Sequence, residues 1–319
     1  MYVEKEMRIE ELCKYVKFWL GEAYQVDCGQ SNKNNGVKEY NILIQELSSG
    51  TTIGVGLEEG NLPEEVDDLK RLGQKIAEDL LHKEAQTFAV DEAKLDDLEL
   101  IKDQIRLKLV NRQANQESLI QTPYISYLDL AITFYVVVRE MENGKLTIRI
   151  NDEILHQWGI TKEQLYVIAR RNMERFAPIS ICSMEKIMMH SAVKAITGGN
   201  YEEGAVFLNS VLLTHGHTGK MYVLTEEKSG LYGASGILYP GVLRQFAEEH
   251  QMDVILLPSS VHEFILFLDK DADYQEIGEM VQSINIRDVD LKDRLSNSVY
   301  LYDRVRNEIR IVKQGDALV

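Results

Sequence analysis

Residues 253–268 read DVILLPSSVHEFILFL, and this stretch decides the fold class. Two largely apolar runs, 253–258 and 263–268, flank the short segment 259–262, which contains two serines, and the first run ends in a proline. Short apolar runs separated by turn-forming residues predict two strands joined by a hairpin turn. Asp273 and Glu276 then predict the capped start of a helix over about 274–284. The stretch therefore predicts a hairpin followed by a helix.

The same order of hairpin and helix recurs at 40–81, 127–158 and 221–250. In the second of these, the run 127–138 is β-branched and aromatic and lacks alternation, which is typical of a strand buried on both faces. In the third, 221–227 and 234–239 are the predicted strands, and 234–258 also fits a strand–helix–strand crossover. The repeated order predicts an α+β fold of mostly antiparallel sheets, with helices packed on the sheet faces.

Helices are also predicted outside these units. Apolar residues recur at helical spacing over 5–20 and again over 93–112, where Leu98, Ile101, Ile105 and Leu109 form one stripe. Thr161 with Gln164 makes a capping box for a helix that reaches about residue 175. We divide the chain into an N-terminal α+β region, 1–122, with a helix, a hairpin and two helices, and a C-terminal α+β region, 123–319.

The composition restricts the class of function. Hydrophobic residues make up 45% of the chain, which is enough for a sizeable core. The 51 acidic and 35 basic residues give a net charge of -16, which repels phosphates and argues against a nucleic-acid partner. The densest basic stretches, 102–112 and 170–171, are expected to be solvated helix faces.

The ends and the cysteines point to the cytoplasm. The N-terminus lacks a basic start followed by an apolar segment, and no run of eighteen apolar residues occurs, so we expect neither secretion nor a membrane span. The three cysteines, Cys13, Cys28 and Cys182, form no CxxC pair and fit a reducing compartment. No cofactor is indicated.

The polar turn of the opening stretch supplies the best candidate catalytic residues, Ser260, His262 and Glu263. If a strand begins at Ser260, alternation places Ser260 and His262 on one face, about 6.5 Å apart, and Glu263 on the other. A Ser–His–Glu relay needs all three groups in line, which a regular strand forbids. A hairpin turn whose serines bond to the local backbone is therefore the favoured interpretation. Tyr239, Asp253 and Ser259 are further candidates for binding a ligand.

Two other segments have residues of functional interest. His215 and His217, within THGHTG at 214–219, have the H-x-H spacing of a shared metal site, although the flanking glycines favour a flexible loop. The glycines of GLYGASG, 230–236, precede a predicted strand rather than a helix. They therefore indicate a bulge or a close approach of the backbone and not a phosphate-binding loop.

Several segments resemble a family of uncharacterised proteins from clostridial-type Firmicutes, which is known only as a domain of unknown function. They include NNGV at 34–37, WGITKEQLYVIARRN at 158–172, LYPGVL at 238–243 and the LPSS and HE elements of the opening stretch. The resemblance extends from about residue 5 to 312. It implies no activity, cofactor or catalytic residue.

These observations favour a non-enzymatic binding or regulatory protein of the cytoplasm, whose partner is another protein or a small ligand. The alternative is a hydrolase or metal-assisted enzyme centred on Ser260, His262 and Glu263. The two hypotheses differ in the surroundings of His262, because the enzyme needs this ring in a pocket beside a carboxylate or a metal.

Overall fold

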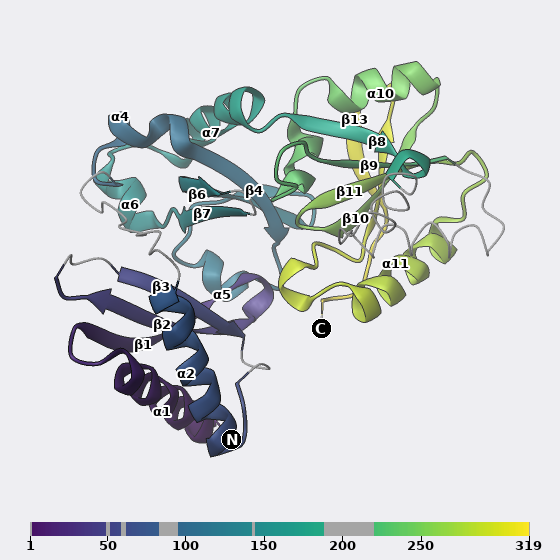
Figure 1. Ribbon diagram of the computed structural model, residues 1–319. Helices are drawn as coiled ribbons and strands as arrows, with labels where there is room; N and C mark the ends of the chain where they lie inside the picture. The colour runs from purple at the N-terminus through teal and green to yellow at the C-terminus, as the bar shows by residue number, and fades with distance from the viewer. Residues whose placement is uncertain are drawn as a thin grey trace. The chain divides into compact units, whose positions relative to one another are not determined.

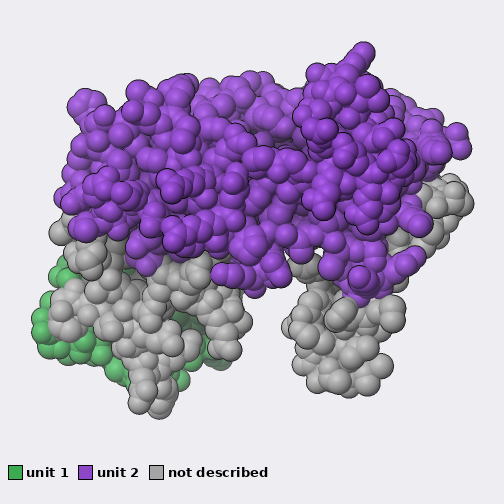
Figure 2. Space-filling model, turned by 90° about the horizontal axis from the view of Figure 1, so that it is seen from above, with its two compact units in different colours: residues 1–92 green, residues 93–319 purple. Residues whose placement is uncertain are grey.

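The computed structural model describes residues 2–48, 52–58, 62–82, 95–141, 144–187 and 220–318. The chain forms two compact units, residues 1–92 and 93–319, which Figure 2 shows in different colours. The division that we predict at residue 122 falls inside the second unit, and it stays a prediction about which segments fold independently. Within the described ranges, no helix is both long and apolar enough to cross a membrane.

The first unit is a three-stranded antiparallel sheet that carries two helices (Figure 1). Its elements are α1 (Tyr2–Leu20), β1 (Tyr24–Asn32), the 3-10 turn η1 (Asn34–Gly36), β2 (Lys38–Glu46), β3 (Thr52–Glu58) and α2 (Val66–His82). One face of the sheet packs with both helices into an apolar cluster that includes Leu12, Ile42 and Leu69. The sequence prediction lacks β1, because most of its residues are polar and exposed.

Helices α1 and α2 approach each other closely at Gly73. A β-carbon at this position would lie 2.7 Å from the β-carbon of Tyr15 on α1. Such a separation is a steric overlap, so only glycine fits unless the helices move apart. The packing of α1 against α2 therefore requires glycine at position 73, although glycine has a low helix propensity and destabilises α2.

The second unit contains two antiparallel sheets, and the smaller one is centred on β6 (Leu130–Met141). Strand β4 (Ile105–Asn111) pairs with one side of β6, while β5 (Ile125–Tyr127) and β7 (Gly144–Arg149) pair with the other. The helical elements of this region are α4 (Leu98–Ile101), η3 (Lys102–Gln104), α5 (Gln116–Leu119), α6 (Asp152–Gln157) and α7 (Lys162–Phe176). The capping box of α7 is present, as predicted.

Among the described residues, the helix predicted over 93–112 is present only as α4, and it is wrong for residues 105–111, which form strand β4. Ile105 and Leu109 belong to the apolar stripe that predicted the helix. A separation of four residues also returns to the same face of a strand, and both side chains are fully buried in the core. The interpretation of this stretch as a solvated face also fails at Arg106, which is 7% exposed and lies with its guanidinium over the Phe176 ring.

The larger sheet has six strands in the order β13-β12-β10-β11-β9-β8, and each neighbouring pair is antiparallel. The strands are β8 (Ile179–Ser183), β9 (Lys220–Glu226), β10 (Val254–Ser260), β11 (Glu263–Leu268), β12 (Val299–Asp303) and β13 (Glu308–Lys313). The predicted strand at 234–239 is wrong, because Gly233–Leu238 form the 3-10 turn η4. A crossover through α10 (Val242–His250) therefore starts from β9 and ends in β10, with β11 between these two strands.

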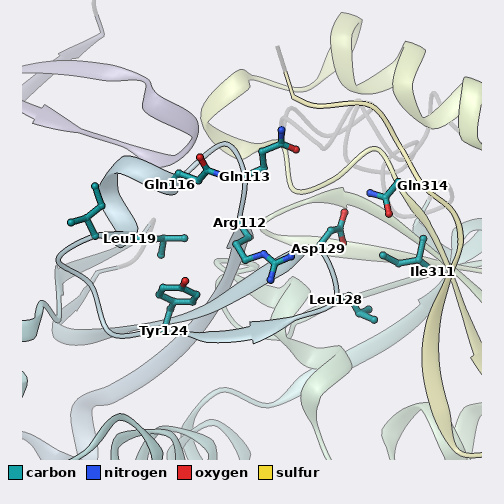
Figure 3. Close-up of a pocket in the computed structure, with 10 residues that line it drawn as sticks. Arg112, Gln113, Gln116, Leu119, Tyr124, Leu128, Asp129, Ile311 and Gln314 are labelled. Atoms are coloured by element: carbon teal, nitrogen blue, oxygen red, sulfur yellow. The ribbon is translucent and has the colours of Figure 1, made fainter.

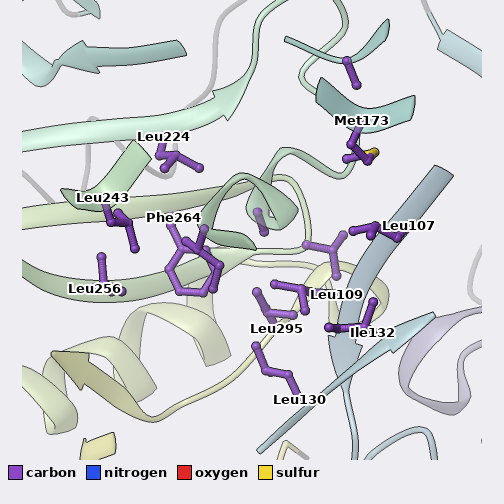
Figure 4. Packing of buried hydrophobic residues seen from close by; sticks show 14 of the residues in the cluster. Leu107, Leu109, Leu130, Ile132, Met173, Leu224, Leu243, Leu256, Phe264 and Leu295 are labelled. Atoms are coloured by element: carbon purple, nitrogen blue, oxygen red, sulfur yellow. The ribbon is translucent and has the colours of Figure 1, made fainter. Parts of the chain in front are cut away.

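The larger sheet is covered on both faces, which explains why Val254–Leu257 of β10 and Phe264–Leu268 of β11 are continuously apolar. Leu256 and Phe264 face a core that also contains residues of the smaller sheet, α7 and α10 (Figure 4). Ile255 and Ile265 point to the opposite side, where the helix α11 (Tyr274–Asp288) packs. The side chain of Asp273 caps α11 as predicted, and the 3-10 turn η5 (Leu291–Asp293) follows that helix.

The predicted fold class is confirmed. Every strand pair in the described residues is antiparallel, and helices pack on the sheets. The order of hairpin and helix is present in β2-β3-α2, β6-β7-α6 and β10-β11-α11. It fails at 221–250, where η4 takes the place of the second strand.

Candidate functional site

His262 lies in the turn between β10 and β11, and Ser260 is the last residue of the preceding strand. Our assumption that a strand begins at Ser260 is therefore wrong, and strand alternation does not decide where the His262 ring points. The backbone N–H of His262 donates to Ser260 Oγ at 3.0 Å, and Ser259 Oγ donates to Glu263 Oε1 at 3.2 Å. The two serine hydroxyls thus bond to groups of their own hairpin.

Both nitrogens of the His262 ring have partners. Nδ1 accepts a hydrogen bond from the backbone N–H of Tyr232 at 3.2 Å, and Nε2 lies 3.4 Å from Asp293 Oδ1. Because Nδ1 is an acceptor, the proton of the neutral ring is on Nε2, where it faces the carboxylate. A catalytic base needs one ring nitrogen directed at the reacting hydroxyl. Among the described residues, neither nitrogen of His262 meets a serine hydroxyl.

The loop that contacts His262 depends on Gly233. A β-carbon at this position would lie 2.2 Å from the backbone nitrogen of Glu226 and 2.5 Å from the carbonyl oxygen of His262. The close backbone approach predicted for this glycine-rich segment is therefore present. The Tyr232 ring stacks on His262 with centroids 5.8 Å apart, and Lys108 Nζ lies 4.6 Å from the centroid of the same Tyr232 ring. His262 therefore fastens the hairpin to this loop.

The remaining candidates lie at separate places. Asp253 precedes β10 at the end opposite to His262, and its Oδ1 accepts from the backbone N–H of Arg304 at 2.9 Å. The Tyr239 hydroxyl donates to carbonyl oxygens of Met173 and Ala177 at the end of α7, and burial raises its pKa well above the usual value. Neither residue joins His262 in a common site. His215 and His217 lie outside the described residues.

A hollow that sequence reasoning missed lies elsewhere in the second unit (Figure 3). Its volume is about 660 Å³, and we call it the Arg112 hollow. Its walls come from the turn after β4, the short helix α5, the turn between β5 and β6, and the end of β13. The lining residues are Arg112, Gln113, Gln116, Leu119, Ile120, Tyr124, Leu128, Asp129, Ile311 and Gln314.

Asp129 is held in the wall of this hollow by three hydroxyl groups. Its Oδ2 accepts from Ser296 Oγ at 2.6 Å and from Ser298 Oγ at 2.9 Å, while its Oδ1 accepts from the Tyr300 hydroxyl at 2.6 Å. Burial, together with the adjacent Asp129 charge, holds the Tyr300 pKa well above its usual value, so the phenol stays a donor. The preceding residue, Leu128, has a φ of 54°, a left-handed conformation that is uncommon for a leucine.

The turn that carries Arg112 is fixed by buried asparagines and by Asp129. Asn111 donates from Nδ2 to the carbonyl oxygen of Leu295 at 3.0 Å and accepts at Oδ1 from Ala114 N at 2.8 Å. The backbone N–H of Arg112 donates to the carbonyl oxygen of Asp129 at 3.1 Å. The Arg112 side chain is exposed, and within the described part of the chain its guanidinium makes no hydrogen bond or ion pair.

The hollow thus combines one cation, one held carboxylate, three glutamine amides and a phenol with an apolar wall. Such a set of groups can bind and orient a polar ligand. In the described residues, no group of three or more histidine, cysteine, aspartate or glutamate side chains is arranged to hold a metal ion. The signal in the sequence is the cluster of polar residues from Asn111 to Gln116, and the helix predicted over 93–112 covers only the first two of them.

The fold and the hollow define an α+β protein with a candidate site for binding a polar ligand. The sequence matches the family of unknown function DUF5688 over residues 6–304, and the chain belongs to this family. The match covers most of both compact units. No curated protein and no solved structure matches the chain. The family was expected from the resemblance, whereas a clostridial origin stays a prediction.

Proposed function

We propose that this chain is a binding protein and that the Arg112 hollow holds a small ligand that carries a carboxylate. The observation that carries the proposal is the exposed Arg112 guanidinium, which lines the hollow without a partner among the described residues. A planar guanidinium matches a carboxylate through two parallel hydrogen bonds. The volume of about 660 Å³ lies within the range of small-molecule sites, roughly 300–1,000 Å³.

The other lining groups narrow the ligand further. The two carboxylate oxygens of Asp129 accept hydrogen bonds from three hydroxyls. A carboxylate offers about four acceptor sites, so one site can still accept a hydrogen bond from the ligand. The amides of Gln113, Gln116 and Gln314 can donate and accept. The proposed ligand is therefore a small carboxylate that also carries an ammonium or hydroxyl group.

Location and partners complete the proposal. Cys13, Cys28 and Cys182 are free thiols, which supports a reducing cytoplasm. The net charge of -16 supports a partner other than nucleic acid. Both are properties that a cytoplasmic binding or regulatory protein would have.

The competing proposal is a hydrolase centred on Ser260, His262 and Glu263. The contact of 3.4 Å between His262 Nε2 and Asp293 Oδ1 favours it, because hydrolytic triads pair a histidine with a carboxylate. Against it, the Ser260 hydroxyl bonds to the backbone of His262 rather than to its ring, and Glu263 bonds to Ser259. The binding proposal therefore has the stronger support.

A thermal-shift screen of the full chain tests the binding proposal. The panel consists of free amino acids, small hydroxy acids and matched amines that lack the carboxylate. At least one carboxylate is expected to raise the unfolding midpoint, because a ligand that binds only the folded state stabilises it. Arg112→Gln is expected to abolish this shift, and Arg171→Gln, an exposed arginine on α7, is expected to keep it. Equal shifts in both variants, or no shift with any carboxylate, would reject the proposal.

A further inference from the structure

Two cysteines of the first unit are placed to react with each other. Cys13 lies on α1 and is buried in the apolar cluster of this unit, with 6% of its surface exposed. Cys28 lies on β1, which is an edge strand of the three-stranded sheet, and it is exposed. The pair therefore consists of one sheltered thiol and one that a solute can reach.

The order of the elements places Cys13 and Cys28 at similar distances from the turn that joins α1 to β1. Helix α1 ends at Leu20 and β1 begins at Tyr24, so the chain reverses between them. Cys13 lies seven residues before the end of the helix, about 10 Å at 1.5 Å per residue. Cys28 lies four residues after the start of the strand, about 13 Å at 3.3 Å per residue.

The strand register places Cys28 on the face of the sheet that carries the helices. Cys28 pairs with Ile42 of β2, and side chains of directly paired residues lie on the same face. Ile42 is fully buried in the cluster that contains Cys13. Val26, two residues before Cys28, packs against the same cluster. Both thiols thus face the junction of α1 and β1.

Cys28 lies close enough to Cys13 to influence the ionisation of the Cys13 thiol. Burial raises the pKa of the Cys13 thiol to about 12, and the Coulombic influence of Cys28 and the hydrogen bond with it contribute further. Cys13 is therefore a protonated, sheltered group at neutral pH. The exposed Cys28 is the group that meets a dissolved oxidant first.

We propose that Cys13 and Cys28 form a reversible redox pair that closes to a disulfide when the protein meets a peroxide. The Cys28 thiolate attacks one peroxide oxygen, the O–O bond breaks, and the leaving hydroxide takes up a proton as water. The Cys13 sulfur then displaces the hydroxyl of the Cys28 sulfenic acid. Its proton leaves with that hydroxyl as a second water, and the S–S bond forms. A reducing dithiol restores both thiols.

Peptide mapping of the full chain tests this proposal. The folded protein is treated with hydrogen peroxide, alkylated, and digested with trypsin without reduction. The expected product links residues 9–14 to residues 18–33 and is lighter than the two free peptides by two hydrogens, and a dithiol removes the link. Cys182→Ser is the matched control and is expected to give the same linked peptide in the same yield. Cys28→Ser is expected to abolish it.

Other products would overturn the inference. They are a link from Cys28 to Cys182, a link between two chains, or a Cys28 that advances to the sulfinic acid while Cys13 is recovered in the alkylated form. Because Cys28 is exposed, Cys28→Ser is expected to keep the fold, which circular dichroism of the variant checks. An absence of any linked peptide in a folded, peroxide-treated wild type would reject the pair as well.

Discussion

Asp129 joins parts of the chain that are far apart in sequence. Its three hydroxyl partners lie between 167 and 171 positions away, two on the segment that leads into β12 and one within β12. Ser296 and Ser298 are buried, so each hydroxyl would carry a desolvation penalty without the carboxylate. The network therefore holds the turn that carries Asp129 against the larger sheet, and it shapes one wall of the Arg112 hollow.

Tyr300→Phe tests the energetic weight of this network. The substitution removes the hydroxyl that donates to Asp129 Oδ1 and leaves a charged, partly buried oxygen with one donor fewer. The free energy of unfolding is expected to fall by about 1–3 kcal/mol, as measured by urea denaturation. Tyr302→Phe is the matched control, because its hydroxyl bonds to Asn307 in a surface turn, and we expect it to lose less. Equal losses in the two variants would contradict the role of Asp129.

The sequence indicated the turn at His262 but not the hollow. Serines next to a proline bond locally, so the hairpin follows from neighbouring residues. Asp293, the ring partner of His262, lies in η5, beyond the next helix, and no local pattern connects the two. Arg112 and Asp129 meet only because β4 pairs with β6, and this pairing was hidden by the incorrect helix over 93–112. A site that is assembled from residues far apart in sequence leaves no local pattern from which it could be predicted.

At the scale of elements, locally encoded features were predicted correctly. The capping box of Thr161 and the cap at Asp273 each involve residues within three positions of one another. Two of the errors have tertiary causes. Strand β4 shares its apolar spacing with a helix, and only pairing with β6 decides between them. The turn η4 replaces a strand where Gly236 packs so closely on β9 that a β-carbon would lie 2.5 Å from Leu224 Cδ2.

Gly73→Ala tests the close approach of α1 and α2. Helix propensity alone predicts a gain of up to about 1 kcal/mol, since alanine favours a helix more than glycine does. The overlap with the Tyr15 β-carbon predicts the opposite, a loss of about 1–3 kcal/mol. We expect the loss, seen as faster hydrogen exchange in α1 and α2. Gly29→Ala is the control, because a β-carbon there meets nothing within 4 Å. Slower exchange in Gly73→Ala would show that the helices are not in tight contact.

At the scale of the whole molecule, several buried phenols make the fold sensitive to alkali. Burial raises the pKa of Tyr127 to about 12 and moves the pKa values of Tyr135 and Tyr239 higher still. It also holds the pKa of Tyr300 well above its usual value. Each folded-state pKa lies above the unfolded value of about 10, so the unfolded chain loses protons first as the pH rises. This contribution to stability is complete below about pH 10 and is lost progressively as the pH rises from there through the folded-state pKa values.

Urea denaturation at about pH 8, 9 and 11 checks this sign. The free energy of unfolding is expected to fall steeply between about pH 9 and pH 11. The Cys13 thiol, whose pKa is also raised to about 12, contributes to this fall from about pH 9. Tyr300→Phe is expected to show a shallower fall than wild type. A free energy that is unchanged or rises from pH 9 to 11 would contradict the burial of these groups.

The central claim is that the Arg112 hollow binds a small carboxylate, and backbone amide chemical shifts test it most directly. The full chain is titrated with the carboxylate that gives the largest thermal shift. We predict that the perturbed amides cluster at 111–116, 128–130 and 311–315, and that Arg112→Gln removes the perturbation. Perturbed amides at 259–263 instead, or none at saturating ligand, would contradict the account.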